Sequence, residues 1–286
     1  MSDSQSYLLT LYSGITGTAS DPTSSILNAI YGGGTASGTG GTTDPVLALK
    51  VAQATETQQV KATAQQASVQ TAIAAFTKGV QSATSVDQLL SNPNVMNVLL
   101  TANGLSDQIG YTALAKQVLT SNLSDTNSLA NTLTDTRWKT IAQTYDFHTN
   151  GLTAIKSQSV IDTITNAYAQ AQWRSNEDSV TPGLSNALYF IANASKATSV
   201  DQLLSDTNLR TVVLTALGVP AQIAYQDLGA QEQAITSRMD ISKLQDPAFV
   251  QQFAQRYLIA NSTSSSGSSS ATDLTTLAVQ ANGILV

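Results

Sequence analysis

Few residues of this sequence are of a type that does chemistry. The chain has one histidine, His148, and no cysteine. The lack of cysteine excludes disulfides, thiolate nucleophiles and thiolate metal ligands, and one histidine leaves a transition-metal site short of its usual ligands. Asp146 lies two residues before His148, which allows a Ser–His–Asp triad to be drawn, but a histidine at a helix end more often adds a favourable charge to the helix C-terminus. From the sequence we assign no catalytic, cofactor-binding or metal-binding residue.

The carboxylates have no spacing typical of a hydrolase. Glu56, Glu177 and Glu232 are far apart along the chain, and Glu177 forms an isolated acidic pair with Asp178 in a predicted loop. Because folding brings distant residues together, a hydrolase with paired carboxylates stays open. Solvated surface is the simpler interpretation of these side chains.

Two short patterns are similar to ligand-binding loops but lack their defining residues. Asp125-Thr-Asn127 begins like a calcium loop, yet the glycine at the sixth position and the glutamate at the twelfth are missing, so the pattern predicts a helix start. The glycine-rich run Gly32–Pro45 contains neither a phosphate loop nor a dinucleotide fingerprint. It predicts a flexible linker.

The charge balance of the chain argues against some classes of binding partner. There are 13 Lys and Arg against 19 Asp and Glu, the net charge is −6, and charged residues make up 11% of the chain, against roughly 25% in typical domains. No basic cluster offsets the negative charge, so we expect no nucleic-acid partner. No run of about 18 apolar residues predicts a transmembrane helix, and the N-terminal residues lack the basic region of a secretory signal.

The helices that would position such residues are indicated by a stretch of sequence that occurs twice. Ala83–Tyr111 matches Ala197–Tyr225 at a constant offset of 114. Nine identities lie in the shared opening ATSVDQLLS and nine follow it, so that 18 of 29 positions agree. Such similarity indicates duplication of a structural unit and predicts the same local fold in both places.

Both copies carry the same helix signals. Ser85-Val-Asp-Gln88 and Ser199-Val-Asp-Gln202 fit capping boxes, in which the serine accepts a backbone N–H and the glutamine reaches back. Gly104 and Gly218 are placed to end the following helix in a left-handed conformation. In the first copy we expect the next helix to run over 107–120.

The similarity continues beyond this block. Asp135–Phe147 corresponds to Asp246–Tyr257 with a small length difference, which pairs Trp138 with Phe249. We predict that the recurring aromatic residues anchor the core, because aromatic side chains dominate buried area, although a ligand cage is conceivable. These residues are Phe76, Trp138, Tyr145, Phe190, Phe249 and Tyr257.

The remaining segments are also predicted to be helical, and none has the period-two alternation of a strand. Val46–Lys78 has neither Gly nor Pro and predicts one long helix, or two with a break near Thr55–Gln59. Ser157–Arg174 and Gly183–Lys196 predict two further helices, the second placing Phe190 where the first copy has Phe76.

The ends are of a different character. The serine-rich run Ser262–Ala271 predicts disorder. Three short apolar segments, Tyr7–Tyr12, Ile26–Tyr31 and Leu274–Val286, either dock on a partner or fold back on the core, and both interpretations stay open.

The sequence therefore predicts an all-α protein with two related multi-helix repeat units in one elongated or bilobed body with flexible ends. We expect a flexible N-terminal segment over 1–45 and a long helix with the first repeat over 46–150. Connecting helices with the second repeat follow over 151–261, and a Ser-rich linker with a short apolar C-terminus occupies 262–286.

With these motifs in view, the chain resembles a bacterial family of unknown function that is common in alphaproteobacteria, can occur in two copies per chain and is often encoded in flagellar gene regions. The resemblance covers roughly residues 76–258. The second copy departs from it, because Ser-Leu-Ala-Asn is missing near Asp240–Leu244 and Tyr-Asp-Phe becomes Tyr257-Leu-Ile259. The motifs that carry it are Val86-Asp-Gln-Leu-Leu90, Leu100-Thr-Ala-Asn-Gly-Leu105, Asn127-Ser-Leu-Ala-Asn131, Asp135-Thr-Arg-Trp138, Tyr145-Asp-Phe147 and Ala187-Leu-Tyr-Phe190.

The resemblance implies a non-enzymatic structural or assembly protein associated with the bacterial flagellum, whose partners are other proteins such as flagellar components. It implies no catalytic residue and no cofactor. The composition, rich in Ser, Thr, Asn, Gln and Ala, fits export without a cleaved signal peptide, and the cytoplasm is the alternative location. The alternative function is a ligand- or polymer-binding module in the groove between the repeats. An enzyme would need several His, Asp or Glu residues gathered in one pocket.

Overall fold

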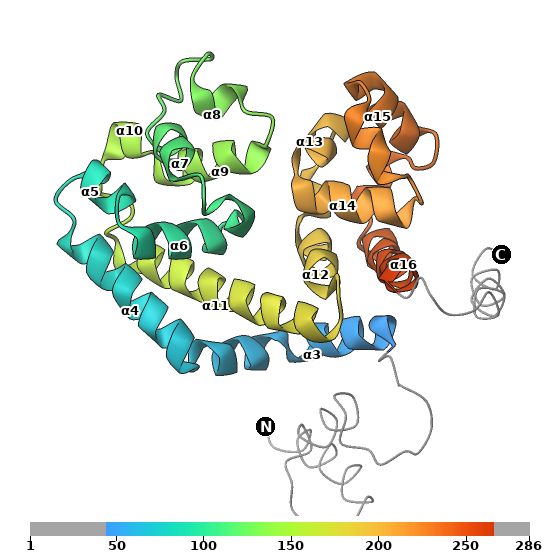
Figure 1. The fold of residues 1–286 in the computed structure, drawn as a ribbon, viewed down its shortest axis with the longest axis horizontal. Helices are drawn as coiled ribbons and strands as arrows, with labels where there is room; N and C mark the ends of the chain where they lie inside the picture. Colours follow the sequence, from blue (N-terminus) through green and yellow to red (C-terminus); the bar gives the residue numbers. More distant parts are fainter. Residues whose placement is uncertain (1–43, 266–286) are drawn as a thin grey trace, which may run out of the picture. The chain divides into compact units, whose positions relative to one another are not determined.

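The computed structural model describes residues 44–265, and in that part of the chain every regular element is an α-helix or a 3-10 helix (Figure 1). The expected all-α fold class is confirmed. The N-terminal apolar segments, the glycine-rich run up to Thr43 and the segment Leu274–Val286 lie outside the described residues.

The helices follow one another with short connections. The first part of the chain contains α3 (Pro45–Ala64), α4 (Ala67–Ser82), α5 (Val86–Leu90), α6 (Pro93–Ala102), η1 (Ser106–Gln108), α7 (Thr112–Leu119), α8 (Leu129–Thr132), α9 (Thr136–Tyr145) and α10 (Phe147–Asn150). The second part contains α11 (Gln158–Val180), α12 (Leu184–Asn193), η2 (Ala194–Lys196), α13 (Val200–Ser205), α14 (Thr207–Ala216), η3 (Ala221–Tyr225), α15 (Leu228–Thr236), η4 (Ile241–Gln245) and α16 (Pro247–Ser265).

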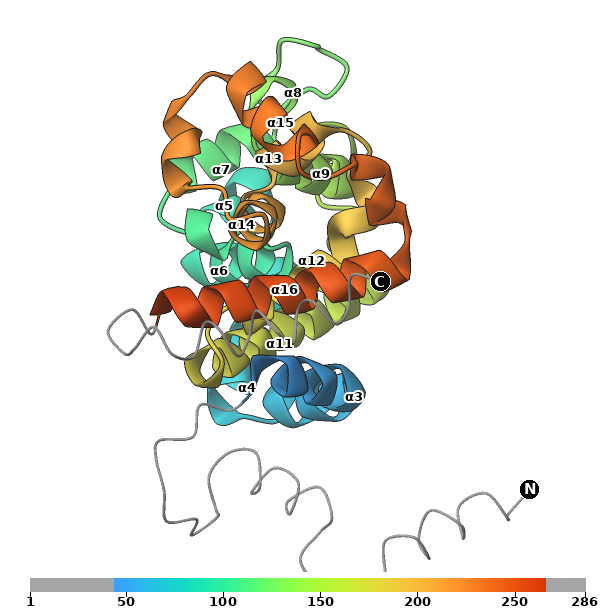
Figure 2. The same cartoon turned by 90° about the vertical axis from the view of Figure 1, so that its right-hand side faces the viewer.

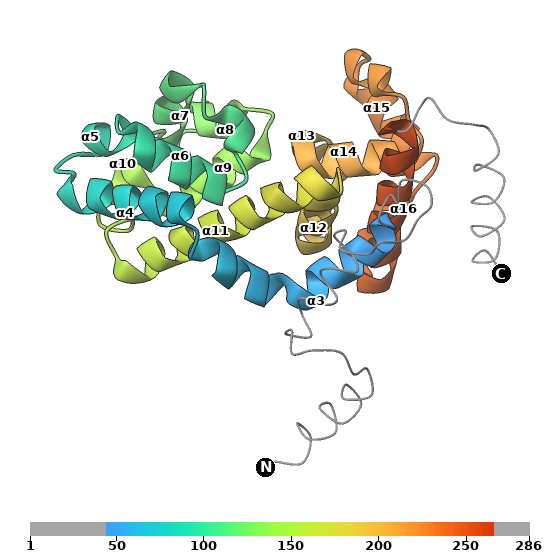
Figure 3. The ribbon, with the colours of Figure 1, turned by 60° about the horizontal axis from the view of Figure 1, so that its bottom comes forward.

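The long N-terminal helix is broken, but later than Thr55–Gln59. Helix α3 ends at Ala64 and α4 starts at Ala67, with Gln66 between them in an extended conformation at φ −65° and ψ 137°. Figure 3 shows the change of direction at this point. The break lets α3 pack on α11, α12 and α16 while α4 packs on α6, so packing rather than a Gly or Pro fixes its position.

One hydrophobic cluster gathers around α4, α6, α9 and the first half of α11. Phe76 and Val80 of α4, Trp138 of α9 and Ile161 of α11 are all at most 3% exposed. Amphipathic spacing produces this cluster, because residues four apart, such as Phe76 and Val80, lie on one helix face. The predicted helix over 107–120 is interrupted here: η1 ends at Gln108, and α7 begins at Thr112.

A second hydrophobic cluster gathers around α12, α14 and α16, which pack on one another (Figure 2), and α12 and α16 also pack on α3. Phe190 and Tyr257 are at its centre at 0% and 1% exposed. In α3, Leu49 belongs to this second cluster and Val60 packs against both clusters, and in α11, Ile161 belongs to the first cluster and Trp173 to the second. Helices α3 and α11 therefore span both clusters, and the domain boundary between 150 and 151 stays a prediction.

The two similar segments have the same local structure. Ser85 and Ser199 each accept a hydrogen bond from the backbone N–H three residues later, at 3.1 and 3.3 Å. Each glutamine reaches back one residue further than expected, to the N–H of the threonine before the serine. Gly104 and Gly218 both have positive φ, 74° and 64°, and end α6 and α14 as predicted. Superposition of the complete units stays a prediction.

The C-terminal low-complexity run begins inside a helix. Helix α16 extends through Ser265, so the first four residues of Ser262–Ala271 are helical rather than disordered, and the rest of that run lies outside the described residues. The side chains of Ser262 and Thr263 bond to the carbonyls of Ile259 and Ala260. These bonds continue the helix into a polar sequence.

Candidate functional site

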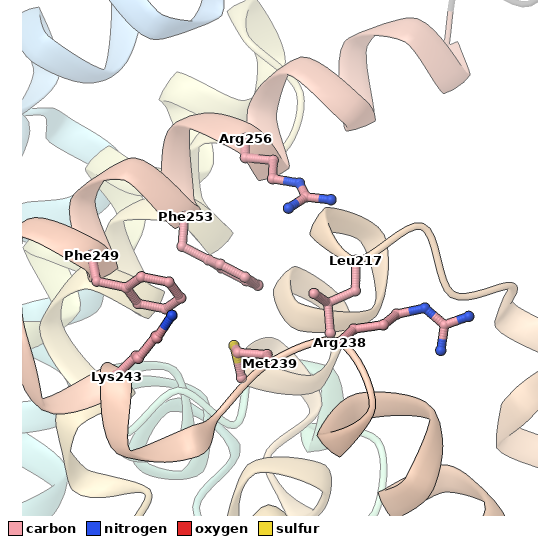
Figure 4. Close-up of a pocket in the computed structure, with 7 residues that line it drawn as sticks. All are labelled: Leu217, Arg238, Met239, Lys243, Phe249, Phe253 and Arg256. Atoms are coloured by element: carbon pink, nitrogen blue, oxygen red, sulfur yellow. The ribbon is translucent and has the colours of Figure 1, made fainter. Parts of the chain in front are cut away.

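A small pocket opens on the second hydrophobic cluster (Figure 4). Its floor is apolar and consists of Leu217, Met239, Phe249 and Phe253. Its rim carries three cations, Arg238, Lys243 and Arg256. The pocket therefore combines apolar surface with positive charge in a protein whose net charge is −6.

Helix α16 forms one wall of the pocket, because its pocket-lining residues are spaced to lie on one helix face. Phe249, Phe253 and Arg256 are four and three residues apart, and this spacing places them on one helix face. The helix starts where it does because Asp246 accepts the backbone N–H of Ala248 at 2.9 Å and Pro247 occupies the first helical position.

The opposite wall consists of turns. Leu217 follows the last residue of α14, just before the chain turns at Gly218. Met239 follows α15, and Lys243 belongs to η4. Four separate elements thus contribute. In Figure 4 the apolar side chains gather around one opening, whereas the guanidinium of Arg238 points away from it.

The apolar floor is firmly packed. Phe253 is 5% exposed and stacks on Phe190 of α12 with ring centroids 5.5 Å apart. Phe249 is partly buried, and its ring centroid also lies 5.5 Å from that of Phe253. Aromatic pairs at this separation are favourable, so the floor is formed before any ligand arrives.

The three cations have few partners. Lys243 Nζ lies 5.8 Å from the centroid of the Phe249 ring, a cation–π distance. Arg238 Nη1 donates to the carbonyl of Ala234 at 2.8 Å. All three cations have exposed side chains, and none takes part in the four ion pairs found within residues 44–265.

The nearest acidic side chain in sequence, Asp240, is engaged locally. Its carboxylate accepts the backbone N–H of Ser242 at 2.9 Å, and this bond, more than the charge of Lys243, lowers the pKa of Asp240. The carboxylate therefore caps η4 rather than neutralising the rim.

The size of the pocket restricts its ligand. Its volume is about 80 Å³, whereas small-molecule sites measure roughly 300–1,000 Å³. The space suits one aliphatic side chain, not a metabolite or a cofactor.

The predicted role of His148 as a helix-end charge agrees with its position. His148 is exposed on α10, at the last turn of that helix. Asp146 uses its carboxylate to cap α10, accepting Thr149 N–H at 3.3 Å and Asn150 Nδ2 at 3.4 Å. Asp146 itself adopts φ 39°, so the chain turns sharply between α9 and α10.

The glutamates and aspartates considered in the sequence analysis mostly form hydrogen bonds or ion pairs that stabilise helices. Glu177 and Asp178 lie inside α11 rather than in a loop, which corrects the sequence prediction. The loop interpretation relied on a lone acidic pair, but α11 continues to Val180, where Asp178 caps the next helix by accepting Ser185 N–H at 2.8 Å. Glu56 accepts Gln170 Nε2 at 2.6 Å and pairs with Arg174 at 3.4 Å, which ties α3 to α11.

One carboxylate pair was not anticipated. Glu232 of α15 faces Asp201 of α13 at the protein surface, and the hydrogen bond and charge of Asp201 raise the pKa of Glu232. The two residues are 31 positions apart, so no local spacing signalled the pair. Within residues 44–265 no group of three or more His, Cys, Asp or Glu side chains is arranged to hold a metal ion.

The recurring aromatic residues lie in the core, with one exception. Phe76, Trp138, Tyr145, Phe190 and Tyr257 are at most 4% exposed, as a core anchor requires. Phe249 is the exception, because it is only partly buried and lines the pocket. The sequence motifs did not single out this pocket; the i, i+4, i+7 spacing of Phe249, Phe253 and Arg256 is the signal that could have located it.

Comparison with known proteins identifies the family. A family model described as "Protein of unknown function (DUF1217)" matches residues 102–250, just over half of the chain. The chain belongs to the DUF1217 family. The match is one continuous stretch that runs from the end of α6 into α16 and includes most of the pocket-lining residues.

A solved structure shows the same fold. The crystal structure of protein AGR_C_984 from Agrobacterium tumefaciens matches this DUF1217 protein with a TM-score of 0.65 at 24% sequence identity, over 78% of this chain and 96% of that one. The recognition of a bacterial family of unknown function is thereby confirmed. No curated protein gives a significant match. None of the helices between residues 44 and 265 combines the length and apolar character that a membrane crossing requires.

Proposed function

We propose that this DUF1217 protein is a non-enzymatic structural or assembly protein that acts by binding other proteins, and that its setting is the bacterial flagellum. The observation that carries the protein-binding role is a pair of tyrosines. Tyr111 and Tyr225 occupy the same position in the two similar segments, and they are 60% and 92% exposed.

Most other shared residues have a role within the fold. The shared leucines at 89, 90, 203 and 204 are at most 4% exposed, and the shared serines and glutamines cap helices. The exposed rings of Tyr111 and Tyr225, in contrast, neither pack in the core nor cap a helix. Tyrosine rings are typical anchors of protein interfaces, because one end is apolar and the other forms hydrogen bonds.

The flagellar setting rests on other support. The family resemblance in the sequence implies it, and the cysteine-free, charge-poor composition fits a protein that is assembled outside the cell. The alternative, ligand binding in the groove between the repeats, stays a prediction. The pocket described above does not support that alternative, because its apolar floor belongs to the second hydrophobic cluster.

The test combines localisation with variants. A fluorescently tagged protein in its native bacterium should localise with the flagellum, and the deletion strain should lose motility. The double variant Tyr111→Ser/Tyr225→Ser should stay folded but lose localisation. Val180→Ser provides a matched control, because Val180 is an exposed apolar residue, at 48%, outside the two similar segments.

Two outcomes would contradict the proposal. A protein spread through the cytoplasm of a fully motile deletion strain would remove the flagellar setting. Unchanged partner binding by the double tyrosine variant would remove the tyrosines as the contact surface.

A further inference from the structure

The pocket lies at one of two places whose sequences correspond. Asp135–Tyr145 and Asp246–Tyr257 correspond in sequence, with 11 and 12 residues. In the first, Trp138 is 2% exposed and α7 and α8 pack on its helix. In the second, the corresponding Phe249 is smaller and only partly buried, and the pocket opens beside it.

The cations at the pocket have no exposed counterpart at the positions that correspond in the first segment, as Arg256 shows. The position of Arg256 is taken by Thr144 in the first segment when the two tyrosines are aligned. The one arginine of α9, Arg137, is 6% exposed and bonded to Asp135 and Asp107. Arg256 of the second segment is instead exposed beside the pocket, where Arg238 and Lys243 join it from the turn after α15 and from η4.

The chemistry of the opening selects an anionic ligand with an apolar part. Space of about 80 Å³ over Phe249, Phe253 and Met239 takes up one aliphatic side chain. Removing that side chain from water provides binding energy in proportion to the apolar area buried. The rim cations attract negative charge that lies next to this aliphatic side chain. The chain as a whole has a net charge of −6, so the positive rim distinguishes the pocket from the rest of the surface.

We propose that the pocket receives one apolar side chain from an acidic segment of a partner protein, whose carboxylates pair with Arg238, Lys243 and Arg256. This inference rests on the proposed protein-binding function and names the partner's chemistry at a second contact point. A peptide fits better than a small anion, because the floor is apolar and the three cations are spread around its edge (Figure 4). Exposed charge pairs are screened by salt, so the contact weakens as ionic strength rises.

The methionines provide a direct readout. The chain has three, and among the described residues Met239 lines the pocket while Met96 is 2% exposed in the other hydrophobic cluster. In protein labelled with 13C at the methionine methyl groups, the signal of Met239 reports on the pocket and that of Met96 is an internal control. The variants Met96→Leu and Met239→Leu assign these two signals and separate them from that of Met1.

The probe is the peptide Glu-Asp-Leu-Asp-Glu, with Glu-Asp-Ser-Asp-Glu as its control. The first peptide should shift the Met239 methyl signal and leave Met96 unchanged. The serine peptide should bind at least about tenfold more weakly. Raising the salt concentration should weaken the leucine peptide further.

Variants identify the rim. Arg256→Glu should reduce affinity for the leucine peptide by about tenfold or more, and Arg256 is exposed, so the variant should fold. Lys139→Glu is the matched control, because it reverses an exposed charge on α9 and changes the net charge equally. Lys243→Glu repeats the test at the other side of the pocket.

Three results would overturn the proposal: no shift of Met239 by the leucine peptide, equal binding of the serine peptide, or full affinity in Arg256→Glu. None of these affects the tyrosine and localisation test. If that test succeeds while the peptide fails, the protein-binding function stands and the pocket has no part in it.

Discussion

Trp138 and Phe249 occupy corresponding positions in two similar segments, and their surroundings differ. Trp138 is enclosed by helices packed on α9, whereas Phe249 stands partly buried beside an opening. The cations differ in the same way, since Arg137 is buried in a network of carboxylates while the three pocket cations are exposed. Two similar sequences are thus surrounded differently: Trp138 lies in a closed core, and Phe249 lies beside an apolar opening with a cationic rim.

The buried network explains part of this difference. Arg137 donates from Nη2 to Asp135 at 2.7 Å and to Asp107 at 3.1 Å, and it also reaches the carbonyl of Gly104. The matching positions for Arg137 and Asp107 in the second segment hold Ala248 and Ala221. The second segment therefore lacks the clamp that ties the η1 turn to α9 in the first.

The largest expected effect tests the closed core. Trp138→Ala should lower the free energy of unfolding by about 3–5 kcal/mol, as truncation of buried aromatics does. Phe249→Ala should cost clearly less, about 1 kcal/mol, because Phe249 is already partly exposed. Urea denaturation of both variants measures the difference. Equal losses would show that the two positions are packed alike, and the comparison would fail.

The next test removes the clamp. Arg137→Ala leaves two carboxylates without their cation and should cost about 3 kcal/mol. Arg137→Lys should not restore the loss, because lysine lacks the planar fork that contacts both carboxylates. Arg256→Ala, which removes an exposed cation of the pocket, should change stability by less than about 0.5 kcal/mol. A large loss in Arg256→Ala would mean that the pocket rim is structural.

A smaller effect depends on pH. Burial raises the pKa of the Asp107 carboxyl, but hydrogen bonds from Arg137 and Gln108 outweigh it and the net pKa lies below its ordinary value. A carboxyl with a depressed folded-state pKa adds stability above its unfolded pKa, near pH 4, and that stability is lost as the pH falls through the folded-state pKa. Asp107→Asn should therefore be less stable than wild type at neutral pH, by a modest amount because the Asp107 side chain is 43% exposed.

The same variant should approach wild type in acid. Below the folded-state pKa of Asp107 both proteins carry a neutral group at residue 107, so the difference in the free energy of unfolding should shrink as the pH falls through that pKa. Urea denaturation at neutral pH and at a series of acidic pH values measures this difference. A difference that stays constant with pH would show that Asp107 contributes through packing and not through its charge.

The smallest expected effect concerns the only histidine. His148→Ala should change the free energy of unfolding by less than about 0.5 kcal/mol, because its side chain is exposed at the end of a short helix. Thermal unfolding, followed by the motility assay, checks both stability and function. Loss of motility with an unchanged melting temperature would support a catalytic role for His148.

Much of the fold followed from local sequence signals. The serines at 85 and 199 cap their helices, and the glycines at 104 and 218 turn left-handed, as predicted. These signals work because a cap or a C-terminal turn involves only a few neighbouring residues and their own backbone. The buried aromatics also followed, because large apolar side chains recurring at helical spacing belong in a core.

Other features depended on residues far apart in the chain. The break at Gln66 has no Gly or Pro to mark it, and it lets α3 pack on α12 and α16 while α4 packs on α6. The acidic pair Glu177-Asp178 lies in a helix because α11 continues across α3 and α12, which its own residues do not reveal. The pairing of Asp201 with Glu232 likewise depends on how α13 meets α15.

The sequence by itself determined the helical class, the caps, the core aromatics and the similarity of the two segments, since each depends on local conformation or on simple burial. Only the tertiary structure decided that Trp138 is enclosed and Phe249 is not, and that Arg238, Lys243 and Arg256 meet around one opening. The reason is physical: a pocket is the space that several elements leave between them, and Leu217 and Arg256 contribute to it from opposite walls, 39 residues apart.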